Sequence, residues 1–163
     1  MQQLFVDGGV IKQNPSPFGG TWAWCLVEDG EKVEGRSGVI LPEDLGTKKK
    51  VVTNNQTELL AAVQGLSALP LTWAGTLFTD SKVTLHRLLG SPSFNGIPQW
   101  LVRKTLELRR NRKWTATLVK GHPTRIEAEN GRTKRGTLVS PWNKWCDDEC
   151  KRLAKNFLAN GGK

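Results

Sequence analysis

The chain has 163 residues, of which 37% are hydrophobic and 24% charged, and its formal net charge at pH 7 is +9. These figures exclude a disordered chain. They predict one compact domain over residues 1–163, because two domains of this total length would each bury too little surface. The excess of positive charge favours a polyanionic partner, above all nucleic acid.

The sequence carries no signal for a membrane or for export. No apolar run approaches the roughly 18 residues that a membrane-spanning helix needs, so we expect no membrane association. Residues 1–4 lack the charged and apolar regions of a secretory signal. The three cysteines, Cys25, Cys146 and Cys150, are odd in number and lack CxxC spacing, which argues against disulfides and against zinc. Cys146 and Cys150 lie four residues apart, on one face of a helix, and are expected to be small core residues. We therefore expect an intracellular, cytoplasmic protein, and we expect it to be a monomer.

The hydrophobic pattern predicts strands and helices in the order β-β-β-α-β-α-α-β-α. In chain order these are strands at residues 4–6, 21–28 and 32–40, a helix at 53–69, a strand at 76–79, helices at 81–89 and 97–111, a strand at 114–119 and a helix at 140–160. Asp29-Gly30 suits a hairpin turn, and Thr53 and Ser140 suit helix N-caps. The polar stretches 42–50 and 123–139 are predicted as loops. This order indicates an α/β protein with a mixed sheet and helices packed on it.

Four acidic residues stand where strand ends and helix starts can meet. Asp7 ends the first strand and Asp80 ends the fourth, whereas Glu58 and Asp147 lie early in the first and last helices. If the first and fourth strands are neighbours, Asp7 and Asp80 converge, and repulsion between crowded carboxylates favours a bound dication such as Mg²⁺. Two such ions about 4 Å apart can activate water and stabilise the leaving oxygen of a phosphodiester. Each acid alone more often serves a turn or a helix N-terminus, but their joint placement favours a metal site.

Four segments resemble motifs of type 1 ribonuclease H, the ribonuclease HI family. In chain order they are Val6-Asp7-Gly8-Gly9 followed by Asn14-Pro15, Thr53-Asn54-Asn55-Gln56-Thr57-Glu58-Leu59, Thr79-Asp80-Ser81, and Val119-Lys120-Gly121-His122 with Asn143-Lys144-Trp145-Cys146-Asp147. The Thr-Asn-Asn and Lys-Gly-His pieces are fairly specific, and Thr-Asp-Ser alone is weak. The resemblance implies a ribonuclease H-like fold, a five-stranded mixed sheet flanked by helices. It also implies an endonuclease that hydrolyses the RNA strand of an RNA–DNA hybrid and leaves 5′-phosphate ends.

The resemblance implies roles for individual residues. The acids that would hold two Mg²⁺ ions, with Mn²⁺ as a substitute, are Asp7, Glu58, Asp80 and Asp147. His122 would assist proton transfer or product departure, and Thr53 would contact a phosphate of the DNA strand. Asn14, Asn54 and Asn55 would read the minor groove, where the RNA 2′-hydroxyls lie. Physical expectation agrees, because telling RNA from DNA requires polar groups that face the 2′-hydroxyl.

Three features leave alternatives open. Asp148 rivals Asp147 as the fourth acid, although choosing Asp148 would put Lys151 on the core face of the last helix. Gln56 stands where the family often has Arg, which would weaken a buried charge network. The stretch 123–142 is longer than usual in the family and is either a solvated insert or an additional contact with nucleic acid.

A basic helix at 97–111 is predicted to hold the substrate. We expect Arg103, Arg109 and Arg110 to face outward and bind phosphates, although a short run of charges is more often a solvated helix face. Two other functions compete with hydrolysis of the hybrid. A catalytically silent hybrid-binding module would not need the four acids, and a DNA-directed nuclease of the same superfamily would not need the Thr53-Asn54-Asn55 motif.

Overall fold

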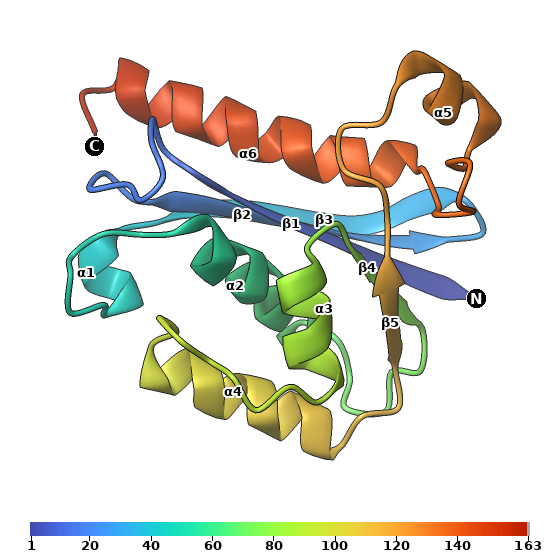
Figure 1. Cartoon of the computed structure of the whole chain (residues 1–163), viewed down its shortest axis with the longest axis horizontal. Helices are drawn as coiled ribbons and strands as arrows, with labels where there is room; N and C mark the ends of the chain where they lie inside the picture. Colours follow the sequence, from blue (N-terminus) through green and yellow to red (C-terminus); the bar gives the residue numbers. More distant parts are fainter. Residues whose placement is uncertain (163) are drawn as a thin grey trace.

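A five-stranded mixed sheet forms the centre of the computed structural model, which describes residues 1–162 (Figure 1). The elements in chain order are β1 (Gln2–Val10), β2 (Gly20–Glu28), β3 (Glu31–Ile40), α1 (Pro42–Leu45), α2 (Asn54–Ser67), β4 (Thr76–Thr79), α3 (Lys82–Leu89), α4 (Gln99–Arg110), β5 (Thr115–Leu118), α5 (Arg125–Asn130) and α6 (Pro141–Ala159). The strand order β3-β2-β1-β4-β5 puts β1 at the centre. The predicted α/β class with a mixed sheet is confirmed.

The central strand β1 joins the two halves of the sheet. It runs antiparallel to β2 and parallel to β4, with Phe5 opposite Phe78. Two residues further along each chain segment, Asp7 and Asp80 therefore reach the same edge of the sheet, as expected for neighbouring strands. β1 is longer than the predicted strand at 4–6, because the backbone continues to pair with β2 through Gly8-Gly9.

Helices cover both faces of the sheet, with α2, α3 and α4 on one side and α6 on the other (Figure 1). One apolar cluster fills the space between the sheet and α2 and buries Leu4, Trp24 and Leu59. A second cluster lies beneath α6, where the free thiols Cys146 and Cys150 are buried, so their predicted core role is confirmed. None of the helices in residues 1–162 combines the length and the apolar character that a bilayer crossing demands.

The start of α2 is fixed by a reciprocal cap. The Thr53 side chain accepts a hydrogen bond from the backbone N–H of Gln56, and the side-chain oxygen of Gln56 accepts one from the backbone N–H of Thr53 at 2.7 Å. Nε2 of the buried Gln56 also donates to the carbonyl of Gly96 at 2.7 Å. Neutral hydrogen bonds thus join α2 to the loop before α4 at the position where the family often has Arg.

The close approach of α2 to β1 depends on Gly8. A Cβ atom at this position would lie 2.4 Å from the carbonyl carbon of Thr57 and 2.5 Å from the backbone nitrogen of Glu58. Any side chain would therefore force the helix away from the strand. With glycine here, the first turns of α2 pack directly on the backbone beside Asp7.

The loops predicted at 42–50 and 123–139 each contain a short helix, so both predictions are wrong in part. α1 is a single turn that starts at Pro42, a residue whose fixed φ suits the first helical position. α5 starts with a capping box, in which the Thr124 side chain accepts from the N–H of Glu127 and the Glu127 carboxylate accepts from the N–H of Thr124 at 3.0 Å. The Thr-x-x-Glu spacing of this box is a signal that the loop prediction overlooked.

α4 packs on α2 and α3. The prediction that the helices pack on the sheet is therefore wrong for this helix, and its placement changes the role of Arg109. Its Nη1 donates to the carbonyls of Arg87 and Ser91, at 3.2 and 3.0 Å, and its guanidinium lies over the ring of Phe94. The expectation that Arg109 reaches outward is therefore wrong, because the side chain is half-buried and ties α4 to the end of α3. Its neighbour Arg110 is exposed.

We predict that Arg109→Ala destabilises the protein more than Arg110→Ala does. Loss of Arg109 leaves two carbonyls without a charged donor, and a hydrogen bond to a charged group contributes about 1.5–3 kcal/mol when buried and less at this half-buried site. Thermal unfolding should show a lower melting temperature for Arg109→Ala, with Arg110→Ala close to the wild type. Equal melting temperatures for the two variants would contradict the anchoring role.

Candidate active site

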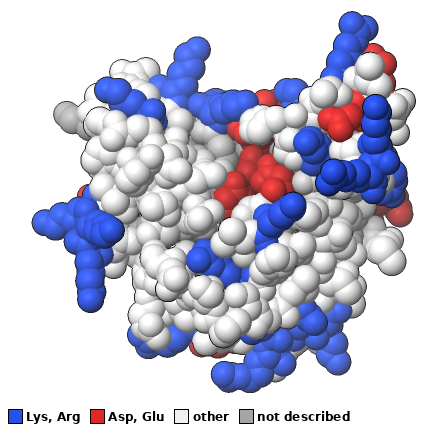
Figure 2. All heavy atoms as spheres, viewed as in Figure 1, with Lys and Arg blue, Asp and Glu red and all other residues white. Residues whose placement is uncertain are grey.

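An open cleft of about 1280 Å³ lies at the edge of the sheet where β1 and β4 end. Its lining includes Asp7, Glu58 and Asp80, together with residues of α6 and of the segment that follows β5. Figure 2 shows the acidic centre of this face with lysine and arginine side chains around it. A chain of net charge +9 thus concentrates negative charge at one point of its surface.

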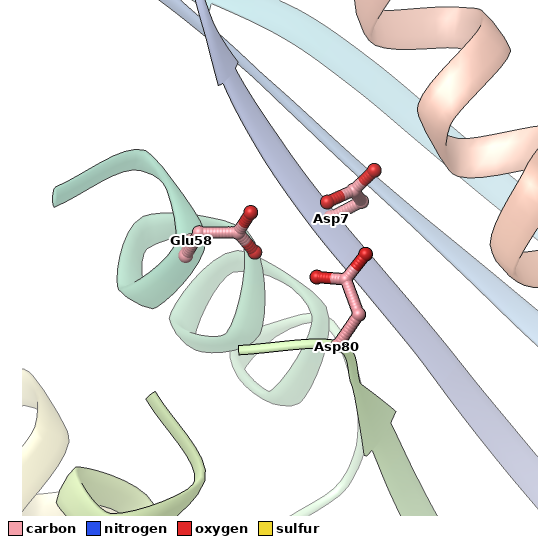
Figure 3. Close-up of side chains that lie close together, drawn as sticks. All are labelled: Asp7, Glu58 and Asp80. Atoms are coloured by element: carbon pink, nitrogen blue, oxygen red, sulfur yellow. The ribbon is translucent and has the colours of Figure 1, made fainter. Parts of the chain in front are cut away.

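Three carboxylates from three elements converge in the cleft (Figure 3). Oxygen atoms of Asp7, Glu58 and Asp80 all lie within 4.8 Å of one another. Asp7 and Asp80 meet because β1 and β4 are parallel neighbours, and Glu58 joins them because α2 packs closely on β1. The predicted convergence of the acids on the sheet edge is confirmed for these three.

Burial makes this group electrostatically unfavourable without a cation. Asp7 is 4% exposed and Glu58 is 5% exposed. Burial, followed by the charge of Asp80, raises the pKa of Asp7 well above its usual value. Burial, followed by the charge of Asp7, does the same to the pKa of Glu58. The pKa of Asp80 is also raised by burial, although Asn143 and His122 act in the opposite direction.

The donor set fits a hard divalent cation. Among residues 1–162, the buried Oε2 of Glu58 has no hydrogen-bond partner, so one carboxylate oxygen at the site is unsatisfied by protein. Carboxylate oxygens are the ligands that Mg²⁺ prefers, and a dication would neutralise the repulsion among Asp7, Glu58 and Asp80. The three residues could therefore hold a metal ion.

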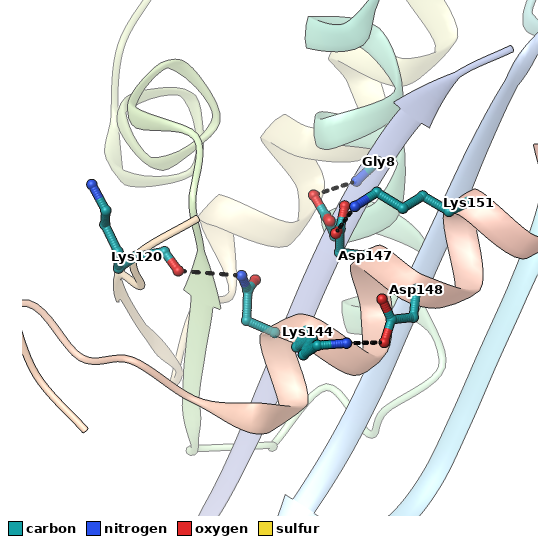
Figure 4. A network of polar contacts seen from close by, with 8 residues as sticks. Gly8, Lys120, Lys144, Asp147, Asp148 and Lys151 are labelled. Atoms are coloured by element: carbon teal, nitrogen blue, oxygen red, sulfur yellow. Dashed lines mark hydrogen bonds and ion pairs between the residues drawn. The ribbon is translucent and has the colours of Figure 1, made fainter. Parts of the chain in front are cut away.

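The last helix turns Asp147 and Asp148 in different directions (Figure 4). Asp147 lines the cleft, and its charge contributes to the raised pKa values of Asp7 and Asp80. Its Oδ2 lies 2.8 Å from Nζ of Lys151, one turn later on α6. Asp148 is exposed and pairs with Lys144 at 2.6 Å. The geometry thus favours Asp147 as the fourth acid, although it lies outside the tight group of three.

His122 lies in the cleft beside the carboxylates. It follows β5 in a turn with φ at 48°, its side chain is exposed, and its charge lowers the pKa of Asp80. An imidazole in this place is near enough to the acids to interact with them and open enough to exchange protons with solvent. The long segment after His122 has not moved it out of the site.

The polar residues at the start of α2 form a continuous edge. Oδ1 of Asn14 accepts a hydrogen bond from the backbone N–H of Asn54 at 3.1 Å, which joins the loop after β1 to the cap at Thr53. Asn54 lines the cleft, and Asn55 is exposed beside it. The two arginines of α4 that are exposed, Arg103 and Arg110, lie outside the cleft lining.

Four residues of the site escaped the sequence prediction. They are polar or basic side chains within or beside the cleft: Lys82, Lys120, Asn143 and Lys151. Asn143 donates through Nδ2 to the carbonyl of Lys120 at 3.4 Å and lies beside Asp80, so it links α6 to the end of β5. Lys151 had a readable signal, since it stands four residues after Asp147 and therefore on the same helical face. Lys120 and Asn143 stand within the quoted motif segments, although no role was predicted for them.

Comparison with known proteins finds relatives named ribonuclease H, although no protein-family model matches the chain. The chain is 28% identical over 168 aligned positions to a ribonuclease H of Campylobacter curvus, and the alignment covers 94% of this chain and 93% of that protein. It is 33% identical over 100 residues to a ribonuclease H of Pseudomonas putida, covering 61% of this chain. In that second alignment the chain spans about half, 53%, of the relative's length.

Two solved structures share the arrangement of the whole chain. The crystal structure of ribonuclease H1 from Halobacterium salinarum superposes with a TM-score of 0.63 at 21% identity, covering 95% of this chain and 98% of that one. The fold is the ribonuclease H fold. The N-terminal ribonuclease H domain of a Mycobacterium tuberculosis protein, at 14% identity, has the same TM-score of 0.63 and covers 99% of both chains. These structures confirm the predicted fold, and the sequence relatives support the predicted resemblance to ribonuclease H.

We predict that Asp80→Asn holds or raises the melting temperature of the metal-free protein at neutral pH. The amide keeps the shape of the carboxyl group and removes one charge from the crowded group of carboxylates. Each kcal/mol of repulsion relieved should add roughly 2–4 °C in a chain of this size. Asp148→Asn, which removes an exposed charge, serves as the control and should have little effect. A large fall in melting temperature for Asp80→Asn alone would show that Asp80 is structural.

The same pair of variants tests how the stability of the metal-free protein changes with pH. The folded-state pKa values of Asp7, Glu58 and Asp80 are raised, so their contribution to stability is fully present below the unfolded pKa of about 4. That contribution is lost as pH rises through the folded-state values. The decline in metal-free stability above pH 4 should therefore be shallower in Asp80→Asn than in Asp148→Asn.

Proposed function

We propose that the chain is an endonuclease that hydrolyses the RNA strand of RNA–DNA hybrids, with two divalent ions held by Asp7, Glu58, Asp80 and Asp147. The observation that carries the proposal is the buried group of three carboxylates in an open cleft. Within residues 1–162, Oε2 of Glu58 in this group has no hydrogen-bond partner. The relatives named ribonuclease H support the same proposed activity. The oxygen-only donor set favours Mg²⁺, with Mn²⁺ as a substitute.

The residues of the cleft are assigned different roles in the proposed hydrolysis. When bound, two divalent ions supply an activated water and stabilise charge on the leaving oxygen. Asp7 and Asp80, from adjacent strands, provide a rigid floor, and Glu58 and Asp147 approach it from the helices on either face. Water releases one proton to solvent as its oxygen bonds to phosphorus, the bond from phosphorus to the 3′ oxygen breaks, and the 3′ oxygen takes up a proton. His122, exposed beside Asp80, is placed to deliver that proton.

Recognition of the hybrid is assigned to the edge at the start of α2. Asn14, Asn54 and Asn55 present amide groups that can both donate to and accept from a 2′-hydroxyl, which is the group that separates RNA from DNA. Thr53 stands at the same edge and is assigned to a phosphate of the DNA strand. The hydrogen bond between Asn14 and Asn54 supports the assignment, because it holds two of these residues together before substrate arrives. The proposal includes a cytoplasmic location, which the three buried free cysteines support.

The decisive experiment compares labelled substrates. The wild-type protein should cut an RNA–DNA hybrid in Mg²⁺ or Mn²⁺, leave 5′-phosphate and 3′-hydroxyl ends, and lose activity in EDTA. Duplex RNA and duplex DNA of the same sequence are the controls and should survive. Hybrid binding without cleavage would identify a silent binding module. Equal cleavage of duplex DNA would identify a DNA-directed nuclease, and either result would overturn the proposal.

We predict that Asp147→Asn reduces cleavage of the hybrid about 100-fold or more, whereas Asp148→Asn stays within a few-fold of the wild type. The two residues are adjacent, yet only Asp147 lines the cleft, so this pair separates metal binding from general helix charge. A loss of several kcal/mol of charge stabilisation corresponds to rate losses of this size. The measurement is initial rate against Mg²⁺ concentration. The reverse order of the two variants would assign the fourth ligand to Asp148.

We predict that His122→Ala slows turnover by about 100-fold without abolishing it, as expected for a group that only moves a proton. The loss should fall on kcat more than on KM, because the imidazole acts on the reacting oxygen. A loss as complete as that of Asp80→Asn would contradict an auxiliary role.

A further inference from the structure

The segment between β5 and α6, residues 123–139, builds one wall of the cleft; we call it the α5 segment. Figure 1 shows it on the α6 side of the sheet, across the sheet from α4. Hydrogen bonds from the N–H of Lys120 to the carbonyl of Leu138 at 2.8 Å, and from the N–H of Val139 to the carbonyl of Gly131 at 3.0 Å, close its base. The capping box of α5 fixes its first half. This insert is therefore a folded wall rather than a solvated loop.

The tip of the α5 segment is a tight turn with two basic residues at its centre. The N–H of Gly136 donates to the carbonyl of Thr133 at 3.0 Å, and the N–H of Thr133 donates to the carbonyl of Thr137 at 2.9 Å. Gly136 has φ at 85°, a conformation that glycine adopts without strain and that closes the turn. Lys134 and Arg135 occupy the two positions between Thr133 and Gly136, so two basic side chains follow one another at the tip.

The charges at this tip are available to a ligand. Lys134 and Arg135 are exposed and line the cleft, and within residues 1–162 neither forms an ion pair with a carboxylate. The two acids of the segment are engaged elsewhere. Glu127 accepts the N–H of the α5 cap, and Glu129 pairs with Arg125. The basic turn thus stands free on the wall of a cleft whose floor is acidic.

We propose that Lys134 and Arg135 bind backbone phosphates of the strand whose scissile linkage lies over Asp7 and Asp80, which is the RNA strand under the proposed function. The inference rests on that function, because an acidic floor binds a polyanion only where cations on the floor and walls offset the repulsion. A turn with two free cations on the same cleft wall meets this need. The segment is then a phosphate clamp beside the active site, separate from the basic helix α4, and it adds affinity without taking part in the chemistry.

The test compares two double variants that each remove two positive charges. Lys134→Ala/Arg135→Ala removes the clamp. Arg36→Ala/Lys113→Ala is the matched control, because Arg36 lies on the edge strand β3 and Lys113 between α4 and β5, and neither lines the cleft. All four side chains are exposed, so thermal unfolding should show both variants folded. Lys134→Glu/Arg135→Glu is a second clamp variant and should bind more weakly than the alanine variant.

Binding to a labelled RNA–DNA hybrid is measured in EDTA over a range of salt concentrations, so that no cleavage interferes. Loss of two phosphate contacts should reduce the slope of log affinity against log salt by about 1.4–1.8 in the clamp variant. The control variant should change the slope less. Ethylation of RNA-strand phosphates near the cleavage site should weaken binding of the wild type but not of the clamp variant.

The outcomes separate the clamp from the proposed function. If the wild type cuts hybrids while clamp and control variants keep the wild-type slope, the clamp is wrong and the function stands. An equal reduction of slope in both variants would also overturn the clamp, because it would show only a general effect of net charge. Tighter binding by the clamp variant would indicate an obstructing lid and overturn it too. If the wild type binds the hybrid but cuts nothing, the function fails, and the slope and ethylation still decide whether the clamp exists.

Discussion

The contact between the backbone of β1 at Gly8 and the first turns of α2 is the constraint on which the site depends. It brings the carboxylate of Glu58 to a pair of aspartates that two parallel strands have already placed at one edge. The result is three acids in a largely buried place, with pKa values raised by burial and, for Asp7 and Glu58, also by the charges of neighbouring carboxylates. Bringing these charges together raises the free energy of the folded protein, and a bound dication lowers it again.

The distribution of the remaining charge follows from this acidic centre. A polyanion would be repelled by the floor, so positive charge is needed on the walls, and the cleft lining supplies Lys82, Lys120 and Lys151 as well as the basic turn of the α5 segment. Lys151 also pairs with Asp147 at 2.8 Å, so one acid of the cleft already has a cationic neighbour. On the face that Figure 2 shows, basic side chains therefore stand around a negative centre.

Two departures from the ribonuclease H pattern are explained by local hydrogen bonds. Gln56 stands where an Arg is usual, and its amide closes the cap of α2 with one atom and holds the carbonyl of Gly96 with the other. The long stretch after His122 folds on its own capping box and closes against the end of β5. In both places local hydrogen bonds hold the backbone, and the sheet and the three carboxylates keep their arrangement.

The sequence by itself determined the order of the main strands and helices, the core positions of Cys146 and Cys150, and the acids that face the sheet edge. These follow from periodicity and from caps, which are local properties of the chain. The same periodicity separates Asp147 from Asp148, because consecutive helical residues differ by about 100° in direction. The helix α5 was equally local, yet its Thr-x-x-Glu cap was overlooked.

Tertiary structure alone decided which charged side chains are free. Arg109 and Arg110 look alike in the sequence, but only Arg109 meets the carbonyls of Arg87 and Ser91, which belong to another part of the chain. The same holds for Lys82 and Lys120, which become cleft residues only when β4 and β5 pair side by side. The direction of a side chain follows from local backbone geometry, whereas its partners depend on contacts between distant segments that no local pattern encodes.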